Sequence, residues 1–343
     1  MIKPKRLQKG DKIATISLSW GGAGTLPSRY KIGKQQMAKM FDIEVIETRH
    51  ALKPADWIYN NPKARADDLT EALEDNSIKA IISNIGGDDS IRLLKHTDPD
   101  VITNNPKIFM GFSDSTVTHF CFYKAGVTSF YGTSTLVGFA ENNGMHQYQI
   151  DDILKTLFSS KPVGQIQPNH DGWTSEMLDW GNPNNQTITR KLEPNSGWRW
   201  PQGGGVVKGS LLGGCVEVME MIKDTRIWVP PSEWKDKIMF LETSEEMILP
   251  EYFCWILRNY AASGILHNIN GLIVARPYND KYTREYDEMI LKVVKEEGLH
   301  DLPIITGMDF GHTCPIFTLP YGVEAEMDMA KQTFSIIENA TED

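Results

Sequence analysis

The sequence predicts an α/β protein built on a mostly parallel sheet, and three observations lead to this prediction. Short apolar runs alternate with helix-like segments through the first half of the chain, which is typical of β-then-α units. Gly86-Gly87 and Gly111-Phe-Ser113 directly follow two of these runs, at strand ends where α/β proteins bind ligands. With 343 residues, 41% of them hydrophobic and 23% charged, the chain can bury a sizeable core in two domains.

The alternation places the expected elements of the first half in order. Strands are expected over residues 12–18, 43–48, 80–84 and 108–111, and helices over 30–40, 64–74 and 117–124, with another beginning at 90–94. On the helix over 64–74, the solvent-facing side is expected to carry Arg65, Asp67, Asp68 and Glu71.

A segment rich in Pro, Asn, Gly and Trp, from about 160 to 205, interrupts this pattern. Long irregular segments in compact proteins are often functional loops or linkers. After it, strands are expected over 238–241, 271–275 and 303–306, helices over 216–222, 251–262 and 283–297, and a closing hairpin over 323–327 and 333–337.

Composition excludes several functional classes. The net charge of −10 argues against a nucleic-acid partner, which requires a basic face. No run approaches the ~18 apolar residues of a membrane span, and the basic start lacks the apolar stretch of a signal peptide. The four cysteines are widely spaced, without a metal-binding pattern, as expected of reduced thiols in a cytoplasmic protein.

Ser113 is the candidate nucleophile. The apolar run ending at Gly111 leads into a Gly-x-Ser turn, and an amphipathic segment follows at once. Such a strand–turn–helix context pushes a serine hydroxyl toward substrate. Ser115 stands where the Gly-x-Ser-x-Gly motif of α/β-hydrolases has its second glycine, which weakens an assignment to that family.

A serine nucleophile needs a base and a group that orients the base. His312 is the candidate base, because it lies in a loop with glycine before it and proline three residues later; the alternative is a packing or capping histidine. His119 is expected to be structural. Glu242 is the candidate acid, because it ends an apolar strand, whereas Glu245 and Glu246 follow in an ordinary charged, solvent-exposed turn.

Backbone amides are expected to hold the oxyanion. The N–H of Asp114, directly after the nucleophile, supplies one donor in such turns, while the Asp114 side chain is expected to point away and be structural. Gly86 or Gly87 can supply the other, because glycine permits close backbone approach; the alternative is a simple tight turn. Gly21-Gly22-Ala23-Gly24 lacks the spacing of a phosphate-binding loop, so no cofactor is predicted.

Seven blocks, spread nearly end to end, resemble one known family. The blocks are residues 4–13 (PKRLQKGDKI), 65–69 (RADDL), 83–89 (SNIGGDD), 111–114 (GFSD), 209–214 (GSLLGG), 240–242 (FLE) and 311–313 (GHT). Together they resemble the LD-carboxypeptidase family of serine peptidases, family S66.

The resemblance implies a catalytic triad of Ser113, Glu242 and His312, the residues selected above on chemical grounds. It also implies an N-terminal Rossmann-like domain (1–160), a linker and substrate loop (161–205) and a smaller C-terminal β/α domain (206–343). The active site would lie between the two domains of a homodimeric enzyme without metal or cofactor.

The segments 197–200 (GWRW) and 241–245 (LETSE), with Trp173 and Trp180, are more similar to the MccF-like, microcin C self-immunity branch of the family. That branch implies hydrolysis of the amide between an acidic aminoacyl group and a nucleotide. Trp173 and Trp180 would stack on the adenine, each contact worth about 1–3 kcal/mol, or else pack the loop onto the body. The alternatives are a muramoyl-tetrapeptide LD-carboxypeptidase of peptidoglycan recycling and a non-catalytic nucleotide-binding protein.

Overall fold

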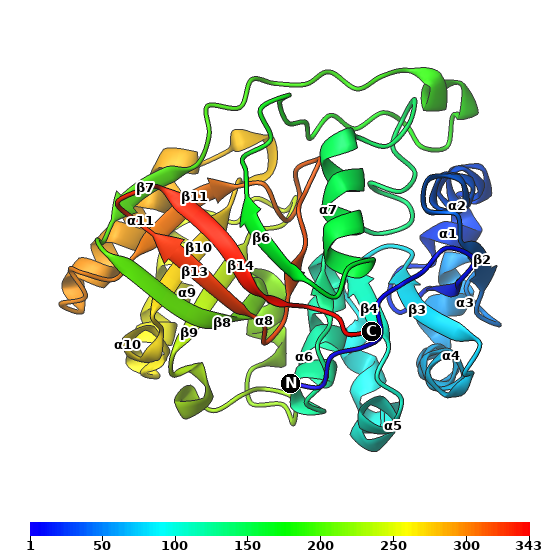
Figure 1. Ribbon diagram of the computed structural model, residues 1–343, viewed down its shortest axis with the longest axis horizontal. Coiled ribbons are helices and arrows are strands. Elements are labelled where there is room, and N and C mark those ends of the chain that lie inside the picture. The colour runs from blue at the N-terminus through cyan, green and yellow to red at the C-terminus, as the bar shows by residue number, and fades with distance from the viewer.

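The computed structural model describes residues 1–343, whose strands form two sheets (Figure 1). The first sheet has the strand order β12-β5-β4-β3-β1-β2. Its first five strands in chain order are parallel, and β12 joins β5 antiparallel at one edge. The strands are β1 (Lys12–Ile16), β2 (Glu44–Glu47), β3 (Ile78–Ser83), β4 (Ile108–Gly111), β5 (Phe130–Tyr131) and β12 (Leu319–Pro320).

Helices connect these parallel strands, so the predicted alternation in the first half is confirmed. The connecting helices are α1 (Gly22–Thr25), α2 (Pro27–Phe41), α3 (Ala55–Asn60), α4 (Pro62–Glu74), α5 (Pro99–Asn104) and α6 (Thr116–Lys124), and α7 (Gln147–Leu157) leads from β5 to the second sheet. The segment expected to start a helix at residue 90 forms a 3₁₀ helix, η1 (Ser90–His96), and another, η2 (Ser113–Ser115), precedes α6.

The second sheet has eight strands, in the order β6-β14-β13-β8-β9-β10-β11-β7. The central strands β8 to β11 are parallel, and the flanking strands are antiparallel to them or to one another. The strands are β6 (Pro162–Ile166), β7 (Arg199–Gln202), β8 (Val206–Cys215), β9 (Lys237–Glu242), β10 (Gly271–Ala275), β11 (Ile304–Met308), β13 (Glu324–Asp328) and β14 (Thr333–Asn339).

The irregular segment from 160 to 205 supplies both edges of this sheet, which the sequence did not indicate. Strands β6 and β7 are short and contain Pro162 and Pro201. Proline cannot donate to a sheet and is therefore confined to edge strands or bulges. The chain runs between these two edges in a long loop that spans the top of the molecule in Figure 1.

The predicted helices of the second half are confirmed, with shifts of a few residues at their ends. They are α8 (Val216–Ile222), α9 (Pro250–Ala262) and α11 (Thr283–Glu296), and shorter elements are α10 (Ile265–Asn268), η3 (Pro183–Thr187), η4 (Pro231–Trp234) and η5 (Tyr278–Asp280). None of the helices has the length and apolar character needed to cross a membrane.

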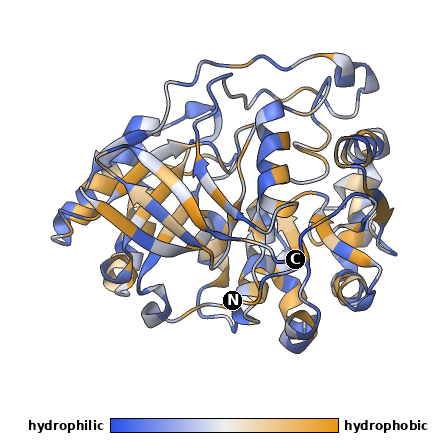
Figure 2. Ribbon diagram, in the orientation of Figure 1, coloured by the Kyte–Doolittle hydropathy of each residue, from blue (hydrophilic) through white to orange (hydrophobic).

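One continuous hydrophobic core runs through both sheets. Strands β4, β10 and β11 are buried along their whole length, as expected where helices or a second layer cover both faces of a sheet, and hydrophobic, orange stretches lie on strands of both sheets in Figure 2. At the junction, Tyr131 of β5 packs against Phe240 of β9, with ring centroids 5.4 Å apart. The ends of strands from the two sheets therefore meet directly.

The prediction that Arg65 and Asp68 face solvent on α4 is wrong. The Arg65 side chain is fully buried and forms a two-pronged ion pair with Asp89, at 2.7 and 3.1 Å. Asp68 is buried too and accepts hydrogen bonds from the Thr48 hydroxyl and the His50 amide. The spacing of charged residues along a helix cannot show that some of them are buried, because a charged side chain can be buried when another charge or hydrogen-bonding group pairs with it.

Candidate active site

Ser113 lies on a sharp turn at the carboxyl end of β4. Its backbone has φ +61°, in the left-handed region that non-glycine residues rarely occupy. Two hydrogen bonds hold the turn: the Ser113 amide donates to the Tyr131 hydroxyl at 3.0 Å, and the Thr116 hydroxyl donates to the Ser113 carbonyl at 2.7 Å. The strained turn presents the Ser113 hydroxyl to a pocket between the two sheets, as the strand–turn–helix pattern predicts.

The structure brings His312 and Glu242 to this serine. The Nε2 atom of His312 lies 3.1 Å from Ser113 Oγ, and Nδ1 lies 2.5 Å from Glu242 Oε2. Glu242 is the last residue of β9, and His312 follows β11 in the same parallel set. Because the carboxyl ends of parallel strands share one edge of a sheet, residues 70 positions apart meet there.

Two glycines make this approach possible. A Cβ atom on Gly311, which has φ +86°, would lie 2.6 Å from Glu242 Oε2. A Cβ atom on Gly86 would lie 2.9 Å from the Ser113 Cβ. Any larger residue at either position would push the backbone away from the acid or from the nucleophile.

The two glycines expected to supply an oxyanion donor lie beside the serine. Gly86 and Gly87 line the same pocket, and neither amide donates a hydrogen bond within the protein. The Asp114 side chain is fully buried and accepts a hydrogen bond from the Ser90 amide at 2.9 Å, so it points away from the pocket. Arg65 supports the glycine loop from behind, since its partner Asp89 ends that loop.

Tyr131 is a site residue that the sequence analysis missed. Its fully buried hydroxyl donates to Glu242 Oε1 and accepts from the Ser113 amide. A single side chain of the first sheet thus contacts both the nucleophile turn and the acid. The signal in the sequence is its place at the end of a short apolar run, which in a parallel sheet falls at the ligand-binding edge.

His312 carries two carboxylate neighbours. The second is Glu245, whose Oε2 lies 3.0 Å from His312 Nε2, although its side chain is 60% exposed. Burial lowers the pKa of His312, but the charge and hydrogen bond of Glu242, together with Glu245, raise it further, to about 10. Sequence analysis placed Glu245 correctly in an exposed turn but did not anticipate this contact.

The pocket around Ser113 has a volume of about 470 Å³. Trp180 lines it and covers the guanidinium of Arg29, which lies 4.7 Å from the ring centroid. Trp173 does not line this pocket. It is buried beside Arg276, at 5.0 Å, and borders a neighbouring polar cavity of about 770 Å³. The two predicted substrate tryptophans thus lie in different cavities.

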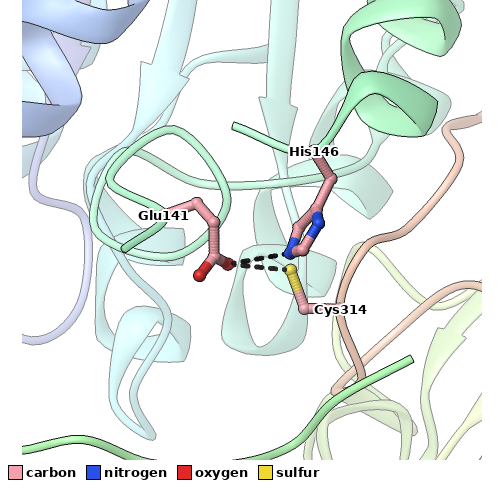
Figure 3. A group of neighbouring side chains, drawn as sticks. All are labelled: Glu141, His146 and Cys314. Carbon is pink, nitrogen blue, oxygen red and sulfur yellow. Dashed lines mark hydrogen bonds and ion pairs between the residues drawn. The ribbon is translucent and has the colours of Figure 1, made fainter. Parts of the chain in front are cut away.

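Behind the pocket, Glu141, His146 and Cys314 point toward one another, with potential ligand atoms within 4.8 Å (Figure 3). Both Glu141 carboxylate oxygens bind the guanidinium of Arg190, through Nε and through Nη2. Although burial opposes it, the nearby His146, 3.6 Å away, and the hydrogen bonds from Arg190 lower the pKa of Glu141 to about 2. Because Arg190 already neutralises this carboxylate, the cluster does not fit a metal ion.

These observations define the class of the protein. A serine on a strained strand-end turn, a histidine within reach of it and a buried carboxylate on the far side of that histidine are the groups of a serine hydrolase. Family models of the LD-carboxypeptidase N-terminal and C-terminal domains match residues 13–132 and 208–327. The chain belongs to the LD-carboxypeptidase family, peptidase family S66, and is a serine peptidase.

Individual relatives cover nearly the whole chain. An MccF-like protein of Streptococcus pneumoniae, solved in complex with AMP, superposes with a TM-score of 0.87 at 32% identity, covering 95% of this chain and 98% of that one. MccF, the microcin C7 self-immunity protein of Escherichia coli, is 27% identical over 97% of this chain and 94% of its own. A structure of MccF with aspartyl sulfamoyl adenosine superposes over 100% of both chains, with a TM-score of 0.86 at 23% identity.

A third relative points to a different substrate. A Bacillus subtilis protein named "probable murein peptide carboxypeptidase" is 25% identical, over 96% of this chain and 93% of its own. The relatives therefore include one named for self-immunity to microcin C7 and one named for murein peptides.

Proposed function

We propose that this protein hydrolyses an amide bond with Ser113 as nucleophile, His312 as base and Glu242 as the group that orients the imidazole. The observation that carries the proposal is the placement of His312, 3.1 Å from Ser113 Oγ and 2.5 Å from Glu242 Oε2. This spacing allows proton transfer without rearrangement of the backbone.

The reaction would proceed in two steps. Ser113 Oγ attacks the scissile carbonyl while His312 Nε2 accepts its proton, and the negative oxygen is held by the amides of Asp114 and of Gly86 or Gly87. His312 then gives the proton to the amide nitrogen, which leaves. His312 Nε2 then takes a proton from a water molecule, and the resulting hydroxide attacks the acyl group and releases it from the serine.

The substrate we propose joins an acidic aminoacyl group to a nucleotide, as in processed microcin C. Trp180 offers an aromatic face within the pocket, and such faces stack on bases. Arg29 lines the same pocket and forms no ion pair with a carboxylate, because its partners are Leu136, Asn142 and Gln186. Its charge suits an anionic group on the substrate. The AMP complex of the Streptococcus relative supports a nucleotide ligand.

A product assay tests this proposal. Purified protein is offered aspartyl sulfamoyl adenosine and a muramoyl tetrapeptide, and products are separated by mass. We expect aspartate and sulfamoyl adenosine from the first compound and no cleavage of the second. Cleavage of the tetrapeptide alone would assign the peptidoglycan reaction instead. Binding of the adenosine compound without turnover would make the protein a non-catalytic nucleotide-binding protein.

Three further proposals concern the whole molecule. We propose a homodimer located in the cytoplasm, with domain limits near residues 160 and 205. Light scattering after gel filtration would give the mass, which for a dimer is twice the 38.7 kDa of one chain. Limited proteolysis with mass analysis would show whether cleavage falls within residues 161–205, and cell fractionation would test the compartment.

A further inference from the structure

Glu245 and Ser113 compete for the same atom of His312. Glu245 Oε2 lies 3.0 Å from His312 Nε2, and Ser113 Oγ lies 3.1 Å from it. An imidazole nitrogen carries a single proton and can donate it to one acceptor at a time. While the negative charge of Glu245 keeps a proton on Nε2, the nitrogen cannot accept the proton of Ser113.

The backbone next to Glu245 is fixed by hydrogen bonds, while its side chain is mostly exposed. Glu217 of α8 accepts hydrogen bonds from the amide and the hydroxyl of Ser244, at 2.9 and 2.8 Å. The Met247 amide donates to the Ser244 carbonyl and closes the turn. The Glu245 carboxylate is therefore presented to the pocket from an anchored turn, and with 60% of its side chain exposed it can rotate away from His312.

No lysine or arginine pairs with Glu245. The groups facing His312 are Glu242, Glu245, the Ser113 hydroxyl and the edge-on ring of Phe112, at 5.1 Å. Of the two arginines that line the pocket, Arg190 is bound to Glu141 and Arg29 is held by amide and carbonyl oxygens. A cation brought by the substrate would therefore find Glu245 paired only with the imidazole.

We propose that Glu245 binds a free α-ammonium group on the acyl part of the substrate. Once this carboxylate has left the imidazolium, the Nε2 proton passes to solvent water, and the neutral nitrogen can act as base on Ser113. The α-nitrogen of an aminoacyl group lies about 2.5 Å from its carbonyl carbon. A carbonyl placed for attack by Ser113 thus brings the ammonium to the same small region as the Glu245 carboxylate. This inference rests on the proposed amide hydrolysis and narrows its substrate class.

The two candidate substrates differ in the charge of the nitrogen next to the scissile carbonyl. An aminoacyl nucleotide has a free α-ammonium next to the scissile carbonyl. In a muramoyl tetrapeptide the corresponding nitrogen belongs to the preceding peptide bond and carries no charge. Glu245 would therefore favour the aminoacyl nucleotide, and each free-amine substrate would help to activate the base that cleaves it.

Two matched substrates and two matched variants test this inference. The substrates are aspartyl sulfamoyl adenosine and its N-acetyl derivative, and the variants are Glu245→Gln and, as control, Glu246→Gln on the exposed neighbouring residue. We expect wild type and Glu246→Gln to prefer the free amine in kcat/KM. In Glu245→Gln this preference should shrink by about 10- to 100-fold, the range for loss of a hydrogen bond to a charged group.

The pH profile gives a second readout. Removing the Glu245 charge lowers the pKa of His312, so the acidic limb of kcat/KM for the N-acetyl substrate should move to lower pH in Glu245→Gln but not in Glu246→Gln. An unchanged preference ratio in Glu245→Gln would overturn the inference while leaving the hydrolase proposal intact. Failure of the wild type to cleave either compound would instead overturn the proposed function.

Discussion

Tyr131 and Glu242 lie 111 residues apart in the chain and are joined by a fully buried hydrogen bond from the tyrosine hydroxyl to the carboxylate. Tyr131 ends β5 of the first sheet, and Glu242 ends β9 of the second. The same hydroxyl accepts a hydrogen bond from the Ser113 amide. The Tyr131 side chain therefore fixes the position of the nucleophile turn relative to the acid. Tyr131 is therefore a positioning residue of the site.

Replacing Tyr131→Phe should lower kcat about 10- to 100-fold with little change in KM. The ring keeps its packing, but Glu242 and the Ser113 turn both lose a partner, and a hydrogen bond to a charged group is worth about 1.5–3 kcal/mol. Tyr321→Phe is the control, because that buried hydroxyl donates to the Gly213 carbonyl instead. Equal loss of kcat in the two variants would show that the effect is general destabilisation.

Gly311→Ala should abolish most activity, because the added methyl would lie 2.6 Å from Glu242 Oε2. Gly298→Ala is its control: the residue also has positive φ, +71°, but a Cβ atom there meets nothing within 4 Å. Both variants should lose about 1 kcal/mol of unfolding free energy from backbone strain. Chemical denaturation measures the effect of backbone strain on stability, and hydrolysis rates measure the effect of displacing Glu242. Full activity in Gly311→Ala would contradict the close approach of Gly311 to Glu242.

His119 should make the protein less stable in acid. Its ring is buried between the Gly111 carbonyl and the Ser129 hydroxyl, and burial lowers its pKa to about 3. In the unfolded chain it titrates near 6.5, so between these values only the unfolded state binds the proton. The contribution of His119 to the free energy of unfolding is fully present above pH 6.5. It is lost as the pH falls below this value, at up to about 1.4 kcal/mol per pH unit. Urea titrations from pH 7.5 to 4.5 should show a shallower fall in His119→Gln; parallel curves would contradict this role.

Arg190→Gln should reduce the free energy of unfolding by about 3 kcal/mol, because it leaves the carboxylate of Glu141 buried without its main partner. Lys191→Gln removes a neighbouring but exposed ion pair, with Glu193, and should leave stability unchanged. Thermal and urea unfolding measure both. A wild-type stability in Arg190→Gln would mean that the arginine does not neutralise this cluster.

Much of the site could be predicted from sequence because its key residues stand at the ends of apolar strands. Ser113, Glu242 and the loop of His312 each follow such a run, and the topology of parallel strands then brings them to one edge. The catalytic roles of these three residues stay a prediction until they are tested by mutation.

Other features depend on contacts that no local pattern encodes. Tyr131 reaches Glu242 across the junction of two sheets, and Glu245 looks like any charged turn residue until His312 is placed beside it. The edge strands β6 and β7 lack apolar alternation because edge positions tolerate proline and half-burial. Trp173 and Trp180 belong to the same Trp-rich segment but line separate cavities. The three-dimensional path of the long loop determines which cavity each tryptophan reaches.

The central claim is that Ser113 is the nucleophile, and the most direct measurement compares hydrolysis of aspartyl sulfamoyl adenosine by wild type and Ser113→Ala, with binding followed by calorimetry. We expect Ser113→Ala to remain folded and to bind the compound, but to cleave it at least ~10⁴-fold more slowly than wild type. Cleavage by Ser113→Ala at the wild-type rate would show that Ser113 is not the nucleophile.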